Sequence, residues 1–402
     1  MTTFRTRQVR ALRVAIAAGV AAALVLPIGA YAAWNQLLDS RAATTVAKNL
    51  VTIPDTPAAL VAAIGEGGQL SHLFVATLDA SGVGGTVVLL PIGTATETAL
   101  AGAGESAGKA APGAARRLAD VFATDGLGGL ANEVQGLLDV SFVAVGAFGR
   151  AELINMLAPL GGVDVRLDRE VVTTAVDGTP TKLAGAGDSS YPIDRVVDIL
   201  LARRQNEKES ERFSRHREVW NGIVKRVGAG VELAPEVDTT PAGLADAGNF
   251  MKRVLGGTLQ VWQLAAAPVL DKTLNPKRID LYSLDRAEVV MVFASVAPSA
   301  MSGADLPLTV MIDSPFNDPV VSRAAVAALL DAGVGVGVMR EVSAKDRPET
   351  SIEADDDVAA ALSALLDGSL GSIATGPWTN QVVGIDAVIT LGADFVASVR
   401  NK

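Results

Sequence analysis

The chain has 402 residues, no cysteine and only two histidines, His72 and His216. Without cysteine there is no disulfide, no thiolate nucleophile and no cysteine-based zinc site, and two histidines cannot form a histidine-rich metal centre. Aromatic residues make up only 4% and charged residues 19%, whereas hydrophobic residues make up 49%. We therefore expect a folded protein whose large core is filled by Ala, Val, Leu and Gly.

A broad basic surface is also missing, since the formal net charge is −10. Binding of duplex nucleic acid depends on clustered Lys and Arg that displace counterions from the phosphates. The sequence also contains no helix-turn-helix pattern with basic recognition residues. These absences exclude nucleic acid as the main partner and argue against transcriptional regulation.

Nucleotide and hydrolase motifs are missing as well. Residues 103–110 read AGESAGKA, but Ala103 replaces the leading Gly of a Walker loop and Ala110 replaces its metal-binding hydroxyl. The glycines from Gly333 to Gly337 follow a predicted helix and fall inside a predicted strand, the wrong order for a dinucleotide fingerprint. No G-x-S-x-G elbow occurs. No motif therefore supports nucleotide chemistry or serine hydrolysis.

The N-terminus predicts a membrane anchor. Four arginines lie within a cytoplasmic tail over 1–13, ahead of an uncharged apolar run over 14–34. A run of this length can cross the hydrocarbon core, and the arginines mark the side that stays in the cytoplasm. The small-x-small pattern at Ala30-Tyr31-Ala32 leaves a cleaved signal peptide as the alternative. With either segment, we expect the rest of the chain outside the cytoplasmic membrane.

Beyond the anchor, the composition predicts a connector over 35–66, an α/β domain over 67–297 and a smaller α/β domain over 306–398. In the larger domain, strands are predicted at 73–78, 86–90, 140–145, 163–167 and 289–296. Helices are predicted there at 116–138 with a Gly break at 126–129, 148–157, 194–201, 212–227, 242–256 and 258–271, with an exposed loop over 173–191. In the smaller domain, strands at 308–312, 334–338 and 387–391 accompany helices at 319–332 and 356–366 and a charged loop at 343–351. This order favours layered α/β architecture.

The densest patch of charge is the stretch 203–218, RRQNEKESERFSRHRE. Arg212 and Arg215 are three apart, the spacing of neighbours on one helix face. Such a face can hold a phosphate through charge-assisted, forked hydrogen bonds. The alternative is a solvated helix with ion pairs such as Glu211–Arg215.

Together these features resemble the LytR–CpsA–Psr (LCP) family of bacterial envelope proteins. The resemblance covers about residues 67–300 and rests on the anchor, the paired strands around Asp79, the segment 142–167 with its Leu-Gly-Gly-Val, and the charged stretch. The segment 310–395 is similar to the LytR-type C-terminal domain that often follows. The resemblance implies a single-pass membrane protein with a layered α-β-α extracytoplasmic domain. Family members transfer glycopolymers from a polyprenyl-pyrophosphate carrier to peptidoglycan.

The family holds the pyrophosphate and lipid head group with Arg-x-Arg, an acidic pair and Arg-x-x-Arg-Gln. In this chain Ala202 stands in the place of the first arginine and His216 in the place of the glutamine. The resemblance implies that Arg204, Arg212 and Arg215 are catalytic, that these three and His216 bind substrate, and that Glu207 and Glu209 bind Mg²⁺.

The other half of the family's site departs from its pattern. An Asp that opens the first strand is replaced by Ser71 or His72, and Ile-Pro-Arg-Asp after the second strand is replaced over 90–94 by LPIGT. Loss of one charge-stabilising donor costs on the order of 10²–10³ in rate. We therefore expect a weakly catalytic or non-catalytic protein, a pseudoenzyme, that binds a polyprenyl-phosphate-linked glycopolymer or a wall-assembly partner. The alternative is an active phosphotransferase that uses Mg²⁺ and delivers the glycopolymer to peptidoglycan.

Overall fold

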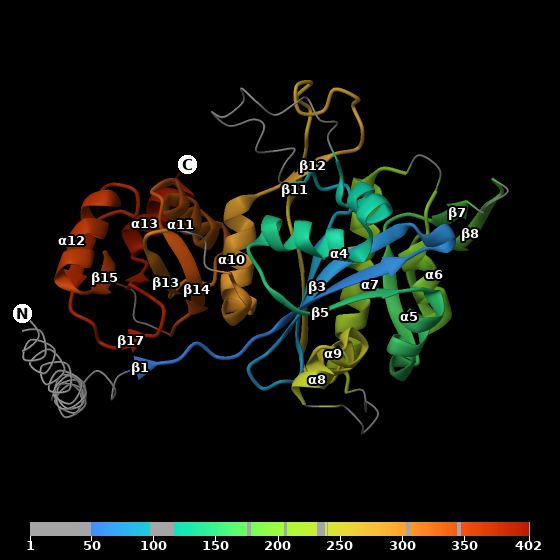
Figure 1. Ribbon diagram of the computed structural model, residues 1–402, viewed down its shortest axis with the longest axis horizontal. Coiled ribbons are helices and arrows are strands. Elements are labelled where there is room, and N and C mark those ends of the chain that lie inside the picture. Colours follow the sequence, from blue (N-terminus) through green and yellow to red (C-terminus); the bar gives the residue numbers. More distant parts are fainter. Residues whose placement is uncertain are drawn as a thin grey trace, which may run out of the picture. The chain divides into compact units, whose positions relative to one another are not determined.

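The computed structural model describes residues 50–96, 116–174, 178–204, 207–230, 238, 240–302, 306–343 and 347–401 (Figure 1). The predicted tail and anchor over 1–34 and the segment 103–110 lie outside these residues. None of the helices within the described ranges is long and apolar enough to cross a membrane.

Within the described residues the chain forms two units, one of 50–52 with Trp378–Val383 and the other of the remaining described residues. In the first unit, β1 (Leu50–Val51) pairs in parallel with β17 (Gln381–Val382). The second unit contains the large core and the elements described below.

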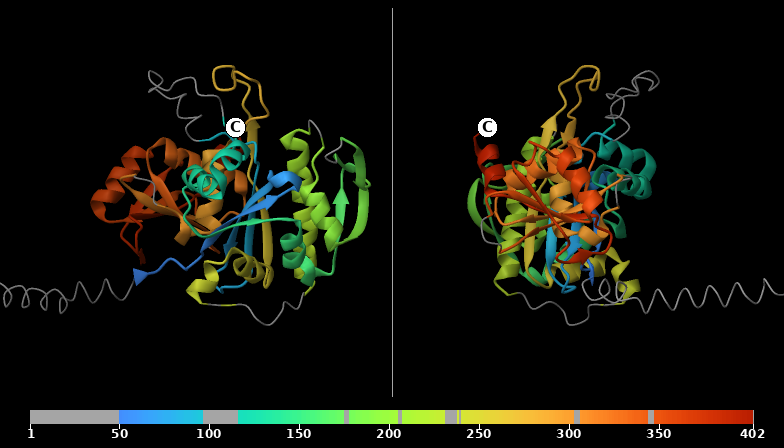
Figure 2. Two further views of the ribbon diagram at one scale, coloured as in Figure 1. Left: turned by 45° about the vertical axis from the view of Figure 1, so that its right-hand side comes forward. Right: turned by 90° about the vertical axis from the view of Figure 1, so that its left-hand side faces the viewer.

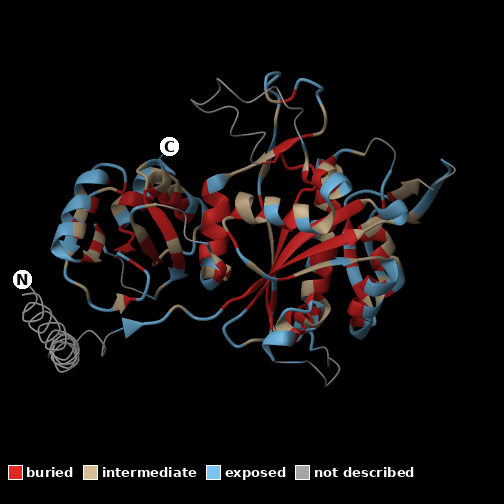
Figure 3. Cartoon of the chain, in the orientation of Figure 1, coloured by how far each residue is buried: buried red, intermediate tan, exposed pale blue. Residues whose placement is uncertain are grey.

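A five-stranded mixed sheet lies at the centre of the second unit. Its order is β10 (Leu259–Gln263), β4 (Gly85–Leu90), β3 (Leu70–Leu78), β2 (Ala58–Ile64) and β5 (Phe142–Phe148). Strand β3 runs antiparallel to both of its neighbours, and the other four strands run in one direction. The three inner strands are buried, except for Ile64 at the end of β2, which is partly exposed (Figure 3). The predicted hairpin of β3 and β4 around Asp79 is confirmed.

Helices cover both faces of this sheet, because its inner strands are apolar on both sides. Helices α4 (Leu118–Leu138) and α10 (Arg286–Val296) share a core with Leu60, Val75 and Val88. The opposite face packs against α5 (Arg150–Leu157), α6 (Ile193–Leu201), α7 (Glu209–Gly228) and α9 (Ala247–Leu255). Figure 2 shows the helices on both sides of the sheet. The result is three-layered, mixed α/β architecture.

A second five-stranded sheet follows in the C-terminal part. Its order is β14 (Gly335–Glu341), β13 (Thr309–Ser314), β18 (Ala387–Thr390), β15 (Thr350–Ala354) and β16 (Ile373–Gly376). It packs with α11 (Pro319–Asp331), α12 (Asp356–Leu365) and α13 (Ala393–Arg400). Helix α10 contacts α11 and β14, so one apolar core continues from the central sheet into this part.

The remaining strands form antiparallel pairs. They are β6 (Gly162–Leu167) with β9 (Gly187–Pro192), β7 (Val171–Thr174) with β8 (Pro180–Ala184), and β11 (Ala266–Pro268) with β12 (Tyr282–Leu284). The short helices are α8 (Pro241–Leu244), η1 (Glu66–Gly68), η2 (Ala158–Leu160) and η3 (Pro298–Ala300).

Two of the sequence predictions are wrong at the centre of the fold. The segment 58–64, predicted as part of the connector, is the buried strand β2. Its sequence AALVAAI is rich in alanine, which is depleted in strands, although small side chains suit a strand with helices on both faces. The segment 289–296, predicted as a strand, belongs to helix α10, where Asp285 caps the start by accepting the N–H of Glu288 at 3.1 Å. A helix buried on nearly all sides is apolar all round and imitates a buried strand.

Three further predictions are wrong at the surface or at an edge. The helix predicted at 258–271 is β10 and β11, because a short apolar run does not distinguish the two structures. The loop predicted at 173–191 is exposed as expected, but it contains β8 and β9. The charged loop predicted at 343–351 ends in β15.

Two glycines shape the helices beside the sheet. Gly126 has φ 70° and interrupts α4, which confirms the predicted break. A Cβ atom at Gly222 in α7 would lie 2.5 Å from the carbonyl oxygen of Asp164 in β6. Glycine at this position therefore allows α7 to approach the strand closely.

Candidate functional site

The candidate site lies at the edge of the central sheet where β2, β4, β5 and β10 have their carboxyl ends, the usual place for ligands in α/β sheets. Strand β4 continues into a turn at 91–94, and helix α7 begins beside this turn. Glu209, in the first turn of α7, accepts the backbone N–H of Ile92 at 3.0 Å through Oε1. The structure thus joins the two sequence stretches that the resemblance pairs, 90–94 and 203–218.

Arg212 forms a buried ion pair with Glu209, in which Arg212 Nη2 donates to Glu209 Oε2. The two side chains are only 5% and 4% exposed. Burial raises the pKa of Glu209, and this rise is opposed by the Arg212 charge and by the N–H of Ile92. The implied phosphate ligand Arg212 is therefore already neutralised by a carboxylate of its own helix.

Arg215 is neutralised in a similar way by Glu207. The two residues form a forked contact, with Nη1–Oε1 at 2.5 Å and Nη2–Oε2 at 3.4 Å, and Arg215 Nη2 also donates to Ala202 O at 2.7 Å. Arg204, by contrast, is 54% exposed and pairs with Glu211 at 3.0 Å. The structure brings these arginines to one region, each with a carboxylate partner.

His216 lies in the core rather than on an open surface. Its Nε2 donates to Leu200 O at 3.0 Å, and its ring centroid is 4.1 Å from that of His72. His72 Nε2 in turn accepts the indole N–H of Trp220 at 2.9 Å. Burial, followed by the Arg212 and Arg215 charges, lowers the pKa of His72 to about 3. Burial and the neighbouring charges also lower the pKa of His216 well below its usual value. Both rings are therefore neutral at pH 7.

Several buried donors around these rings have no partner within the described ranges. Since His72 Nε2 accepts a hydrogen bond, its proton is on Nδ1, and that N–H is unpaired. The Nε–H groups of Arg212 and Arg215 and the hydroxyl of Ser71 are also unpaired. An unpaired buried donor costs about 1–3 kcal/mol, so these groups indicate a place for an oxygen acceptor.

Two arginines of the site were missed in the sequence. Arg203 forms no side-chain hydrogen bond or ion pair within the described part of the chain. Its side chain is exposed, but partial burial lowers its pKa. The charges of Arg212 and Arg117 lower the pKa further, and those of Glu209 and Glu207 raise it. Arg117, at the start of α4, pairs with Asp120 at 2.8 Å. The Arg116-Arg117 doublet at the start of the helix predicted over 116–138 was the available signal.

Asp280 and Tyr282 were also missed, because they lie far along the chain in an unremarkable segment. Asp280 Oδ2 accepts the backbone N–H of Glu209 at 2.6 Å, and its Oδ1 accepts the Tyr282 hydroxyl at 2.9 Å. The backbone N–H of Tyr282 donates to Gly93 O at 3.0 Å. Asp280 and Tyr282 therefore fix the turn at 91–94 against the start of α7.

Two cavities flank the segment before α7. One of about 600 Å³ is lined by Arg204, Glu207 and Arg215, together with Asp168 and Glu218. Burial, and then a hydrogen bond with Asp168, raises the pKa of Glu218 to about 7.

The other cavity, of about 480 Å³, is lined by Arg203, Arg150 and Gln69. The consecutive residues Arg203 and Arg204 thus line different cavities, and each cavity is large enough for a small polar group.

Glu207 and Glu209, the implied Mg²⁺ ligands, do not fit a metal site in this arrangement. Both oxygens of Glu207 contact Arg215, and those of Glu209 contact Arg212 and the N–H of Ile92. Mg²⁺ requires near-octahedral oxygen coordination. Within the described ranges, no group of three or more His, Asp or Glu side chains is placed to hold a metal ion.

No family model matches this sequence, and no curated protein matches it. Solved structures of low similarity include TagV of B. subtilis, with 13% identity and a TM-score of 0.41, covering 59% of this chain and 94% of the other. TagU of B. subtilis has 17% identity, a TM-score of 0.32 and the same coverage. TagT bound to LIIa-WTA has 12% identity, a TM-score of 0.39 and coverage of 59% and 88%. TagV, TagT and TagU are LCP proteins. Each of these three TM-scores lies below 0.5.

Proposed function

We propose that this chain is a membrane-anchored cell-envelope protein of the LCP type, with a LytR-type C-terminal domain. It binds the phosphate of a polyprenyl-phosphate-linked glycopolymer and has weak or no transferase activity. The observation that carries the proposal is Arg203, which forms no ion pair within the described ranges and lines the cavity of about 480 Å³ together with Arg150. The charges of Arg212 and Arg117 also act on Arg203 and lower its pKa. A phosphate anion would relieve the repulsion among these guanidinium groups and accept forked hydrogen bonds from Arg203.

The unpaired donors support an oxygen-rich ligand in the same region. The Nε–H groups of Arg212 and Arg215 and the Nδ1–H of His72 need acceptors. Phosphate oxygens are strong acceptors, and ordered water is the other source of oxygen.

Weak catalysis follows from how the arginines are used. Transfer of a phosphoryl group needs preorganised cations on the charge that develops in the transition state. Here Arg212 and Arg215 already form ion pairs with Glu209 and Glu207. The turn at 91–94 also presents Ile92 and Gly93 where the family carries Arg and Asp. The residues present are suited to holding a phosphate more than to stabilising its transfer to peptidoglycan.

The test is a binding measurement on the full chain in detergent micelles, with a polyprenyl phosphate as the probe. The matched ligand is the same polyprenol without phosphate. The matched variants are Arg203→Ala at the site and Arg217→Ala. Both arginines are exposed and belong to the same charged stretch, but Arg217 lines neither of the two cavities. One charge-assisted hydrogen bond contributes 1.5–3 kcal/mol, so Arg203→Ala is expected to raise Kd roughly tenfold to a hundredfold.

Arg217→Ala is expected to leave Kd unchanged, and the polyprenol is expected to bind more weakly than its phosphate. Equal Kd values for the two variants, or for the two ligands, would contradict the proposal that Arg203 binds a lipid phosphate. Thermal unfolding of each variant checks that a lost signal does not come from a lost fold.

A further inference from the structure

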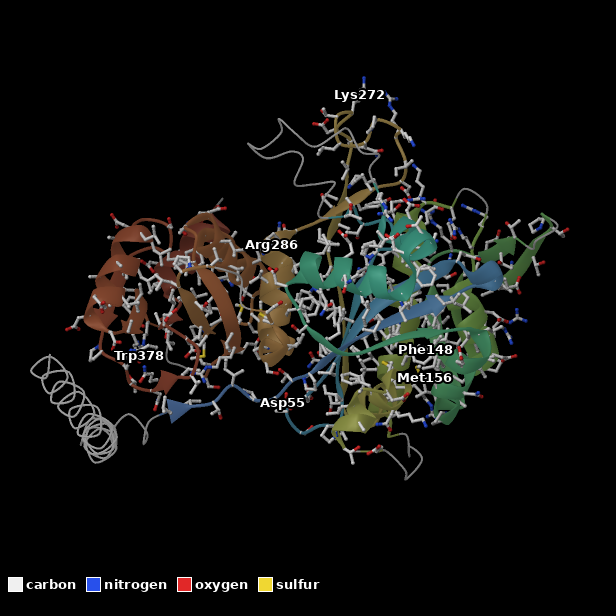
Figure 4. The ribbon with its side chains drawn as sticks, in the orientation of Figure 1. Asp55, Phe148, Met156, Lys272, Arg286 and Trp378 are labelled. Atoms are coloured by element: carbon white, nitrogen blue, oxygen red, sulfur yellow. The ribbon has the colours of Figure 1, made fainter. Side chains whose placement is uncertain are left out.

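A loop over 269–281 joins β11 to β12 and projects from the same edge of the central sheet (Figure 1). Figure 4 shows Lys272 at the outer end of this loop. Lys272, Lys277 and Arg278 are all exposed. Leu270 is 83% exposed, more than any other large hydrophobic side chain within the described ranges. The loop therefore presents an apolar side chain among three cations.

The loop has a fixed shape, although the residues of its outer part, 271–273 and 276–278, are exposed. Asn275 is only 5% exposed, and its Nδ2 donates to Val269 O at 3.1 Å and to Ile279 O at 2.8 Å. Its Oδ1 accepts the N–H of Ile279 at 3.0 Å. One buried amide thus closes the base of the loop. Because the backbone is held in this way, exposure of Leu270 is a property of the folded loop rather than of a frayed end.

The charge of the tip is opposite to that of the whole chain, which has a formal net charge of −10. Asp271 is the acidic residue of the outer part, and its Oδ1 accepts the backbone N–H of Thr273 at 2.6 Å and its hydroxyl at 2.5 Å. With Asp280 at its base, the loop has three cations and two carboxylates, which leaves an excess of one positive charge. An exposed leucine with neighbouring cations is the chemistry that binds the interface of an anionic bilayer.

The base of the loop is joined directly to the candidate site. Asp280 accepts the N–H of Glu209 at 2.6 Å and the hydroxyl of Tyr282 at 2.9 Å. A surface that holds the loop tip therefore also holds the start of α7. This connection gives the loop an orientation relative to the residues that would meet a lipid phosphate.

We infer that loop 269–281 docks on the surface of an anionic phospholipid bilayer. Leu270 enters the interface, and Lys272, Lys277 and Arg278 contact the head groups. The docked loop turns the carboxyl edge of the central sheet toward the membrane, where a lipid-linked substrate carries its phosphate. The inference rests on the membrane location in the proposed function and does not require binding of a glycopolymer.

The test uses the absence of cysteine, because a single introduced thiol can be labelled without background. Leu270→Cys in the full chain carries an environment-sensitive dye and is reconstituted in nanodiscs. About one third of the lipid is phosphatidylglycerol in one sample, and all of it is phosphatidylcholine in the other. The dye at 270 is expected to shift to the blue and to be quenched by lipid-borne quenchers only in the anionic nanodiscs. The matched control is Val320→Cys, a 68% exposed position on α11, with no expected shift.

A second variant removes the cations and keeps the label: Lys272→Gln, Lys277→Gln and Arg278→Gln together. Each cation near an anionic surface contributes roughly fivefold in partitioning, so the anionic signal is expected to fall to that of phosphatidylcholine. The inference is overturned if the dye at 270 responds equally to both lipids, or if it responds to protein concentration, which indicates a protein partner. The label reports bilayer contact with no ligand present, so loss of phosphate binding leaves this result unaffected.

Discussion

Glu209 accepts the backbone N–H of Ile92 at 3.0 Å, although the two residues lie 117 positions apart in the chain. The same carboxylate neutralises Arg212, and the backbone N–H of Glu209 is held by Asp280. One side chain therefore connects the turn after β4, the cationic face of α7 and the base of the projecting loop. This connection explains why Glu209 is buried in spite of its charge.

Replacement of Glu209 by alanine is expected to destabilise the protein by about 3–5 kcal/mol, because it leaves Arg212 buried without a counterion. Glu211→Ala is the matched control, since its carboxylate is 34% exposed and pairs with exposed arginines. Such pairs contribute about 0–1 kcal/mol. Urea unfolding measures the loss of stability in both variants, and the dependence on urea concentration (the m-value) is expected to be unchanged.

A double variant separates the ion pair from the burial of the two side chains. Glu209→Leu with Arg212→Met removes both charges, so it is expected to be more stable than Glu209→Ala. A double variant as unstable as Glu209→Ala would show that the unpaired charge of Arg212 does not cause the loss of stability in Glu209→Ala.

The free energy of unfolding is expected to decrease as the pH is lowered, because of His72. Burial lowers the pKa of His72 from 6.5 to about 3. Between these values the unfolded chain binds a proton that the native chain does not bind. The contribution is fully present above about pH 6.5 and is lost as the pH falls, by about 1.4 kcal/mol per pH unit. Urea unfolding at several pH values from about 7 to about 4 measures the slope.

His72→Gln is the matched variant, because its amide oxygen can still accept the N–H of Trp220. In this variant the slope of the unfolding free energy against pH is expected to be smaller by the contribution of about one proton. The carboxylates contribute equally to the slope in both proteins. The low pKa of His216 adds a slope of the same sign in both. Identical slopes for the wild-type and variant proteins would contradict the assignment to His72.

Gly222→Ala is expected to destabilise the protein by about 1–3 kcal/mol, since its Cβ atom would lie 2.5 Å from the backbone oxygen of Asp164. Gly228→Ala lies in the same helix with nothing within 4 Å of the added carbon. There we expect a gain of about 0.5–1 kcal/mol from lower entropy of the unfolded chain. Thermal unfolding compares the two, and equal shifts would show that α7 does not depend on close contact with β6.

Transfer to peptidoglycan is expected to be at background when the full chain is given a polyprenyl-pyrophosphate-linked glycan, with or without Mg²⁺. The physical reason is that Arg212 and Arg215 are already paired with carboxylates. The measurement is radiolabelled glycan recovered with the wall. Mg²⁺-dependent transfer that disappears in Arg212→Ala with Arg215→Ala would establish the transferase in place of the binding protein.

The sequence by itself determined the local elements that have a clear pattern. The hairpin of β3 and β4 follows from two apolar runs around a Gly-rich turn, and the break in α4 follows from Gly126. The charged stretch over 203–218 also identified the helix that carries the arginines. These features depend on neighbours in the chain, which a sequence shows directly.

Only the tertiary structure decided what those residues contact. Strand β2 and helix α10 were misread, because burial on several sides outweighs the propensities of alanine and valine. The sequence also did not show which carboxylate each arginine pairs with. Contacts such as Glu209 with Ile92 and Asp280 join residues far apart in sequence, and the energy of a buried charge depends on whatever the fold places beside it. The sequence determined that an arginine-rich helix would form. The fold decided that Arg212 and Arg215 in this helix, and Arg204 ahead of it, would pair with carboxylates, whereas Arg203 forms no ion pair within the described residues.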